Sequence, residues 1–152
     1  MTEAEPVLLD TDILSELSRG NATVAALAQA YLRAFGRLTV SSVTVFERLR
    51  GYRQAIQAGK PFHRQLHAFE TLVQTSVVLP FDENAAAVSA EIWAACSRAQ
   101  RQKLGDILIA GIAVARQIPL ATRNQRDFEM LSKNARVSLR LVDWTARAKR
   151  VR

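Results

Sequence analysis

The chain has 152 residues, of which 49% are apolar and 23% charged, and this length and composition describe one globular domain without a second independent core. Its single cysteine, Cys96, excludes an internal disulfide and suggests a buried thiol in a reducing compartment. No apolar run approaches the roughly 18 residues that span a bilayer. Because the N-terminal residues are acidic where a signal peptide is basic, we expect a cytoplasmic protein without a membrane anchor. The net charge of the chain is +7.

The first half of the chain predicts two strands that alternate with helices. An apolar run at residues 6–9 ends at Asp10 and is long enough for a buried strand but too short for a helix. Residues 38–40, followed by the cap candidates Ser41 and Ser42, predict a second strand that leads into a helix. The helical spacing of apolar residues predicts helices over residues 13–17, 24–35 and 43–56.

The second half continues this alternation. Residues 77–80 predict a third strand, and Asp82 is placed to cap one long helix over residues 83–102. The remaining predicted elements are a helix that Gly105 opens and that covers residues 107–116, a strand over 119–122, a short helix over 127–133 and a strand over 138–142. Strands separated by helical stretches indicate βαβ units. We therefore expect a three-layer α/β fold with a mainly parallel five-stranded sheet flanked by helices.

Positive charge is concentrated in the last third of the chain. Residues 1–97 carry 8 basic and 10 acidic side chains, whereas residues 98–152 carry 13 basic and 4 acidic side chains. Such a surface suits a polyanion such as RNA or DNA. The alternative is that the excess positive charge only keeps the protein soluble or fills a tail. We expect one domain over residues 1–145, followed by a basic tail at residues 146–152 that carries part of this charge.

Four carboxylates are predicted to gather at one edge of the sheet, because open parallel sheets place their sites beyond the carboxyl ends of the strands. Asp10 directly follows the first strand, and Asp127 follows the fourth. Glu47 lies one turn into the helix after the second strand, and Asp106 lies in the first turn of an otherwise apolar helix. Carboxylates that converge in this way repel one another, an arrangement that persists chiefly when a divalent cation neutralises it.

Each of these carboxylates also has a purely structural interpretation. Asp10 is a candidate helix cap, and Asp106 is placed to stabilise a helix N-terminus. Glu47 has Arg50 within reach on the same helix, and Asp127 is placed to be a turn residue. His63 and His67 have a spacing that could hold Zn²⁺ on a helix, but no third ligand lies nearby in sequence, so we interpret them as surface or partner-contact residues.

The motifs around these carboxylates strongly resemble those of PIN-domain ribonucleases, most closely the VapC-type toxins of bacterial toxin–antitoxin pairs, including the FitB-like branch. The resemblance rests on residues 8–17, 41–47, 105–111 and 121–128 and covers nearly the whole chain. It implies a PIN-like fold, an RNA substrate, a cognate antitoxin and a homodimer or higher toxin–antitoxin assembly. It also implies that Mg²⁺ or Mn²⁺ is bound by Asp10, Glu47, Asp106 and Asp127.

Two positions depart from the pattern of the resembling proteins. Position 12 is Asp where such proteins usually have Asn, and Asn124 stands where some relatives have an acid. The fourth carboxylate of the expected site is therefore assigned to Asp127. Thr122 is a candidate for a contact with phosphate or for support of the metal ligands, and its alternative is an ordinary threonine at a strand end.

An oxygen-only site suits Mg²⁺ or Mn²⁺, and a metal-activated water can attack phosphorus without a His or Cys nucleophile. The basic residues that either position the substrate near this site or form a solvated face are Arg98, Arg101, Lys103, Arg123 and Arg126. We expect a metal-dependent endoribonuclease that acts as a toxin. The alternatives are a catalytically silent nucleic-acid-binding or regulatory module, and a DNA-directed nuclease. The apolar faces of residues 24–35 and 43–56 further suggest a groove for another chain.

Overall fold

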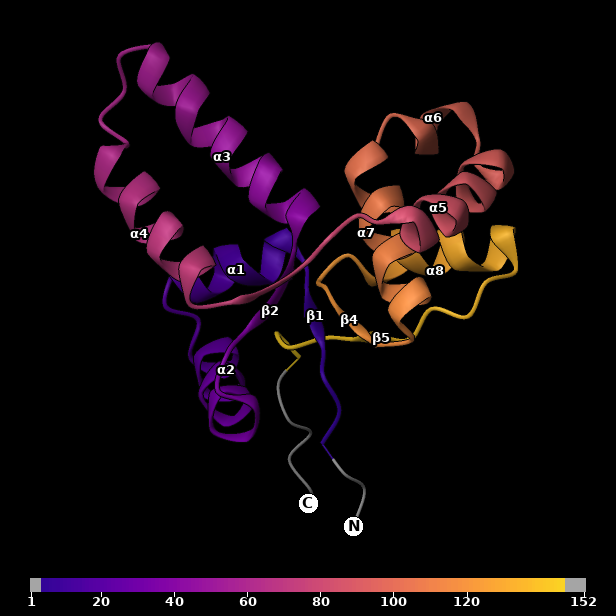
Figure 1. The fold of residues 1–152 in the computed structure, drawn as a ribbon, viewed down its shortest axis with the longest axis horizontal. Coiled ribbons are helices and arrows are strands. Elements are labelled where there is room, and N and C mark those ends of the chain that lie inside the picture. Colours follow the sequence, from indigo (N-terminus) through magenta and orange to yellow (C-terminus); the bar gives the residue numbers. More distant parts are fainter. Residues whose placement is uncertain (1–3, 147–152) are drawn as a thin grey trace.

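Short parallel strands alternate with helices in the computed structural model, which describes residues 4–146 (Figure 1). The elements in chain order are β1 (Leu8–Leu9), α1 (Thr11–Ser18), α2 (Ala22–Phe35), β2 (Thr39–Ser41), α3 (Ser42–Gln57), α4 (His63–Gln74), β3 (Val77–Leu79), α5 (Glu83–Ala95), α6 (Arg98–Arg101), α7 (Leu104–Arg116), β4 (Leu120–Ala121), α8 (Gln125–Ala135) and β5 (Leu141–Val142). The predicted basic tail lies outside the described residues from residue 147 onward. None of the described helices is both long and apolar enough to cross a membrane.

All strand pairs are parallel, which confirms the predicted α/β class. In one sheet β4 lies between β1 and β5, and in the other β2 pairs with β3. The expectation of a single five-stranded sheet is therefore wrong, because the five strands form a three-stranded and a two-stranded sheet. Each strand has only two or three residues, so each ladder is short, and β1 and β2 lie next to each other without joining the two ladders.

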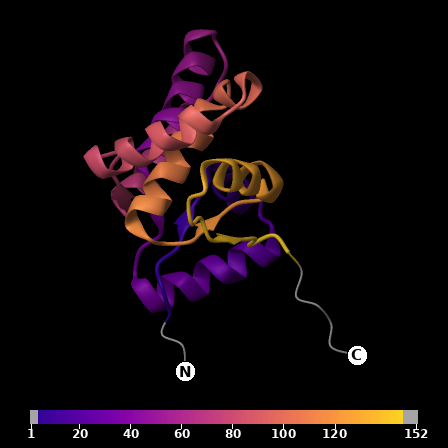
Figure 2. The same cartoon turned by 90° about the vertical axis from the view of Figure 1, so that its right-hand side faces the viewer.

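The core lies on both faces of the strands, because successive side chains of a strand point to opposite faces. Leu8 packs into a cluster formed with α5, α7 and α8, whereas Leu9 packs into a second cluster formed with α1, α2 and α4. In β4, Leu120 and Ala121 divide in the same way. Figure 2 shows α2 on the opposite side of the strands from α7 and α8. This arrangement confirms the expected three layers.

The long helix expected over residues 83–102 is broken into α5 and α6. Cys96 adopts an extended backbone conformation (φ −80°, ψ 146°), and Ser97 then begins α6 with a capping box in which its side chain and that of Gln100 each bond the other's backbone N–H. A Ser followed three residues later by Gln is a local helix-start signal. The thiol of Cys96 is only partly buried, which corrects the expectation of a buried thiol.

One helix, α4, was not expected from the sequence. Its residues are mostly exposed, and only Leu66 and Phe69 are buried. Together with α3 it forms the arm that extends away from the sheets in Figure 1. The helix is held in place by packing against α3, which the local sequence does not reveal.

Candidate acidic active site

Three of the four expected carboxylates line one depression beyond the carboxyl ends of the strands. The depression has a volume of about 320 Å³ and is lined by Asp10, Glu47 and Asp106, together with Asp12 and Asn124. These side chains come from the β1–α1 junction, α3, α7 and the loop after β4. The structure thus brings Asp10, Glu47 and Asp106 together at one depression, as expected from the sequence, although only Asp10 directly follows a strand.

Asp10 is both a helix cap and a wall of the depression. One of its carboxylate oxygens accepts a hydrogen bond from the Thr11 backbone N–H (2.8 Å), and the other accepts one from Thr122 Oγ1 (2.8 Å). The residue is only 5% exposed. Burial, reinforced by the neighbouring Asp12 carboxylate, raises the pKa of Asp10 to about 7.

Asp12 has a carboxylate oxygen that the fold does not satisfy. Its Oδ2 accepts hydrogen bonds from the Arg123 backbone N–H (3.0 Å) and from Thr122 Oγ1 (3.3 Å). Its Oδ1 is buried and has no hydrogen-bond partner among residues 4–146. Burial also raises the pKa of Asp12 above its usual value. Because an unpaired buried carboxylate oxygen is costly, this atom indicates a ligand that the chain itself does not supply.

Glu47 is held between α1 and the N-terminus of α7. The Thr11 hydroxyl lies within hydrogen-bonding distance of Thr44 Oγ1 (3.1 Å) and of Glu47 Oε1 (3.3 Å). Gly105 admits the carboxylate from the other side, because a Cβ at this position would fall 2.6 Å from Glu47 Oε2. The alternative pairing with Arg50 is not formed, since the Arg50 guanidinium lies over the Phe46 ring, 5.4 Å from its centroid.

Asp106 lies in the first turn of α7 without being its cap, because the N-cap position is occupied by Lys103. Burial, followed by repulsion from Glu47, raises the pKa of Asp106 to about 6, and the nearby Lys103 ammonium partly offsets this increase. A carboxylate in the first turn of a helix is favoured by the helix dipole. The raised pKa of Asp106 nevertheless means that burial and the neighbouring carboxylates disfavour its anionic form.

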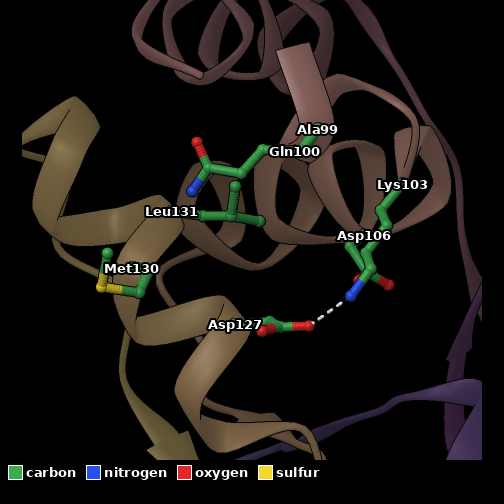
Figure 3. A pocket seen from close by; sticks show the side chains of 7 residues that line it. All are labelled: Ala99, Gln100, Lys103, Asp106, Asp127, Met130 and Leu131. Atoms are coloured by element: carbon green, nitrogen blue, oxygen red, sulfur yellow. Dashed lines mark hydrogen bonds and ion pairs between the residues drawn. The ribbon is translucent and has the colours of Figure 1, made fainter. Parts of the chain in front are cut away.

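Asp127 is separated from the other three carboxylates. It lies in the first turn of α8, its side chain is 41% exposed, and its Oδ2 accepts a hydrogen bond from Lys103 Nζ at 2.6 Å. That bond, followed by a contribution from Asn124, lowers the pKa of Asp127. Figure 3 shows Lys103 and Asp127 facing each other beside Asp106. Asp127 therefore lines a neighbouring pocket that shares Asp106 with the acidic depression.

Thr122 supports the acidic residues from behind. It is fully buried, donates toward Asp10 and Asp12, and accepts a hydrogen bond from the Asn124 backbone N–H (3.0 Å). This geometry agrees with a supporting role, and the burial leaves no access for a direct contact with phosphate. The guanidinium of Arg123 binds Glu16 at 2.7 Å, so this arginine clamps the loop after β4 to α1.

The donors that face the depression fit a hard divalent cation in their chemistry. They are carboxylate oxygens, one of them unpaired, and burial raises the pKa of three of the carboxyl groups, those of Asp10, Asp12 and Asp106. Among residues 4–146, however, no three Asp, Glu, His or Cys side chains lie close enough together to make a complete metal site. His63 and His67 are exposed on α4 and belong to no such group in the described part of the chain.

Comparison with known families matches residues 7–134 to the PIN domain. The chain is 33% identical over 128 residues to the VapC ribonuclease Y4jK of Sinorhizobium fredii, a match that covers 81% of this chain and 90% of that protein. It is 34% identical over 112 residues to the tRNA(fMet)-specific endonuclease VapC of Shigella flexneri, covering 72% and 77% of the two chains.

Solved structures share the fold. DNA-bound VapBC from Salmonella typhimurium superposes with a TM-score of 0.69 at 23% identity, covering 93% of this chain and 99% of that one. VapBC-1 from nontypeable Haemophilus influenzae gives a TM-score of 0.70 at 22% identity, covering 93% and 100%. At these sequence identities, the similarity to the solved structures shows a shared fold and nothing more.

Proposed function

The chain belongs to the PIN-domain family, and from this premise we propose that it is a metal-dependent endoribonuclease, the toxin of a toxin–antitoxin pair, which hydrolyses RNA phosphodiester bonds. Two similar proteins are named as a ribonuclease and a tRNA-specific endonuclease. The observation that carries the proposal is the acidic depression, which Asp10, Glu47 and Asp106 line together with Asp12, a residue whose Oδ1 has no hydrogen-bond partner among residues 4–146.

Asp10, Glu47 and Asp106 are the residues that would hold Mg²⁺ or Mn²⁺. The fourth expected ligand, Asp127, is bound to the Lys103 ammonium and can reach the cation only when this ion pair breaks. When bound, such a cation supplies an activated water and stabilises negative charge on the phosphate during hydrolysis. Asp12 adds an oxygen that no other described residue satisfies and that belongs to the same set of donors.

The other residues of the site keep the carboxylates in place. Thr122 holds the side chains of Asp10 and Asp12 with one hydroxyl, and Thr11 orients Glu47. Without a cation these carboxylates repel a phosphate, so the substrate has to be drawn in by positive charge around the depression. Lys103, whose ammonium acts on Asp106, supplies such a charge, and its side chain is 60% exposed.

The cheapest test is incubation of the purified protein with total cellular RNA and with single-stranded DNA, in Mn²⁺ and in EDTA. We expect discrete RNA fragments that EDTA abolishes and that Asp106→Asn does not produce. Asp82→Asn is a matched control, because Asp82 caps α5 away from the depression and Asn caps nearly as well as Asp. RNA binding without cleavage at any metal concentration would support a silent binding module, and cleavage of DNA alone would support a DNA-directed nuclease.

We also propose a homodimer and an antitoxin that covers apolar surface. Large apolar side chains remain exposed on α2 and α3, with Leu32 at 41% and Phe46 at 61% exposure. Related solved structures contain VapBC pairs. Light scattering of the isolated protein tests the homodimer, and a strict monomer at high micromolar concentration would contradict it.

A further inference from the structure

A second pocket adjoins the acidic depression and shares Asp106 with it, but its lining is different. The pocket lies between α6, the start of α7 and α8, and most of its lining is apolar, from Ala99, Met130 and Leu131. Figure 3 shows Gln100 and Leu131 at one end and Lys103, Asp106 and Asp127 at the other. An occupant of this pocket would therefore have an apolar body next to a charged group at the acidic site.

Resting on the ribonuclease function proposed above, we propose that this pocket binds one pyrimidine base of the RNA, that of a nucleotide at the bond that is cut. Bases of single-stranded RNA can be turned out of the strand and held in protein pockets, where their edges are read by hydrogen bonds. Because the pocket ends at Asp106, a base within it places its own phosphate at the carboxylates. The pocket thus determines which bonds of a strand are cleaved.

The size of the pocket fits one six-membered ring. Its volume is about 170 Å³, and an engineered protein cavity of roughly 150 Å³ accepts benzene. One pyrimidine ring fills such a space, whereas the second ring of a purine would remain outside it. Leu131, which is 5% exposed, forms an apolar wall, and Met130, which is 46% exposed, offers a thioether to the ring.

Gln100 supplies the hydrogen-bond donor that recognises the base. Its Oε1 accepts a hydrogen bond from the Ser97 backbone N–H (2.8 Å), so the capping box fixes which end of the amide is oxygen. The amide Nε2 is then left to donate toward the pocket, where a pyrimidine ring presents the carbonyl oxygen that cytosine and uracil share. The same capping box thus begins α6 and orients the recognition group.

Lys103 gives the pocket the charge that a nucleotide requires. Its side chain lines the pocket, its ammonium lies close enough to Asp106 to lower the pKa of that carboxyl group, and its present partner is the Asp127 carboxylate. A phosphate attached to the bound nucleotide finds a cation there. A neutral apolar ligand would have no use for this charge, which favours a nucleotide as the occupant.

Two variants test the base site without touching the carboxylates. Ala99→Leu fills the pocket from an exposed position on α6. Gln100→Glu keeps the capping box, which accepts Glu as well as Gln, but replaces the amide donor by a carboxylate. Ala68→Leu, the same enlargement at an exposed position of α4, is the matched control.

The assay uses a short single-stranded RNA with one mapped cleavage site, and versions of it with a purine or an abasic residue at the flanking position. We expect wild-type kcat/KM to fall about tenfold or more on the purine and abasic versions, the scale of one apolar contact in a specificity pocket. Ala99→Leu and Gln100→Glu should lose a similar factor on the pyrimidine substrate and little on the abasic one. Fluorescence anisotropy of the same RNAs in EDTA should show the same loss of binding.

The outcomes separate the two proposals. If wild-type protein with Mn²⁺ cuts no RNA, the ribonuclease function fails and the base site fails with it. If wild-type protein cuts RNA but shows no pyrimidine preference at its sites, or if both variants cut every substrate as wild type does, the base site alone is overturned. A loss in Ala68→Leu equal to that in Ala99→Leu would also overturn it.

Discussion

The carboxylate of Glu47 lies against Gly105 so closely that a Cβ at position 105 would fall 2.6 Å from Glu47 Oε2 and 3.0 Å from its Cδ. Gly105 is in the first turn of α7, where its missing side chain lets α3 and α7 bring Glu47 and Asp106 into one depression. Gly105→Ala should therefore displace Glu47 while α7 still forms, because Ala is a better helix former than Gly. We expect RNA cleavage to fall by at least tenfold with an unchanged circular dichroism spectrum.

Gly51 provides the control for this prediction. It lies in α3, and a Cβ there would meet nothing within 4 Å. Gly51→Ala should keep full activity and gain up to about 1 kcal/mol in unfolding free energy from helix propensity. Full activity in Gly105→Ala would show that the position of Glu47 is not critical.

Asp106→Asn should separate metal binding from folding. The substitution keeps the shape of the side chain but removes one negative charge from a group that is partly buried and repelled by Glu47. Metal affinity should fall, turnover should drop by orders of magnitude, and the metal-free protein should be equally stable or more stable by about 1 kcal/mol. Added Mg²⁺ should raise the melting temperature of the variant less than that of wild type. An active variant with an undiminished response to metal would remove Asp106 from the site.

Lys103→Met should release Asp127 toward the acidic depression. The ammonium of Lys103 now binds this carboxylate at 2.6 Å and also faces Asp106. If Asp127 is the fourth ligand, Mn²⁺ should bind several-fold more tightly to the variant, since the competing cation is gone. RNA binding should weaken. The negative slope of the logarithm of the RNA-binding constant against log salt should become shallower by about one unit per phosphate contact removed. Isothermal titration with Mn²⁺ measures the first effect and anisotropy over a salt series the second.

Lys60→Met is the control for Lys103→Met, because Lys60 is an exposed lysine between α3 and α4. It changes the net charge by the same amount without touching Asp127. Weaker Mn²⁺ binding in Lys103→Met than in Lys60→Met would contradict the competition between Lys103 and the metal.

The stability of the metal-free protein should fall as the pH rises through the range from about 4 to about 7. The folded-state pKa values of Asp10 and Asp106 are raised to about 7 and about 6, so the folded state binds more protons than the unfolded state in this window. The stabilisation is complete below the ordinary carboxyl pKa and is lost as pH passes the raised values. Thermal melts in EDTA should therefore show a higher melting temperature at pH 5.5 than at pH 8.

Excess Mg²⁺ should reverse this trend, because the cation binds the deprotonated carboxylates and is favoured at the higher pH. Asp10→Asn should flatten the pH dependence in EDTA, since it removes the group with the larger shift. A metal-free melting temperature that is constant, or that rises with pH, would show that these carboxyl groups are not stabilised in their protonated form.

The sequence by itself determined the alternation of elements, the parallel α/β class and the positions of Asp10, Glu47 and Asp106. The reason is that these features are local: a short apolar run indicates a buried strand, helical spacing indicates a helix, and an acid directly after a strand, as at Asp10, falls at the edge where sites form. Glu47 lies one turn into the helix after the second strand, and Asp106 is conspicuous as an acid in an otherwise apolar helix. The break between α5 and α6 was also visible in principle, because Ser97 and Gln100 have the spacing of a capping box.

Only the tertiary structure decided the contacts between distant parts of the chain. The hydroxyl of Thr122 binds Asp10 across 112 residues, Lys103 holds Asp127 across 24, and the space beside Gly105 is filled by Glu47 from another helix. The division of the strands into two sheets and the packing of α4 on α3 arise in the same way. Periodicity reports which face of an element is buried but not what it meets, because the partner is chosen by the packing of the whole chain.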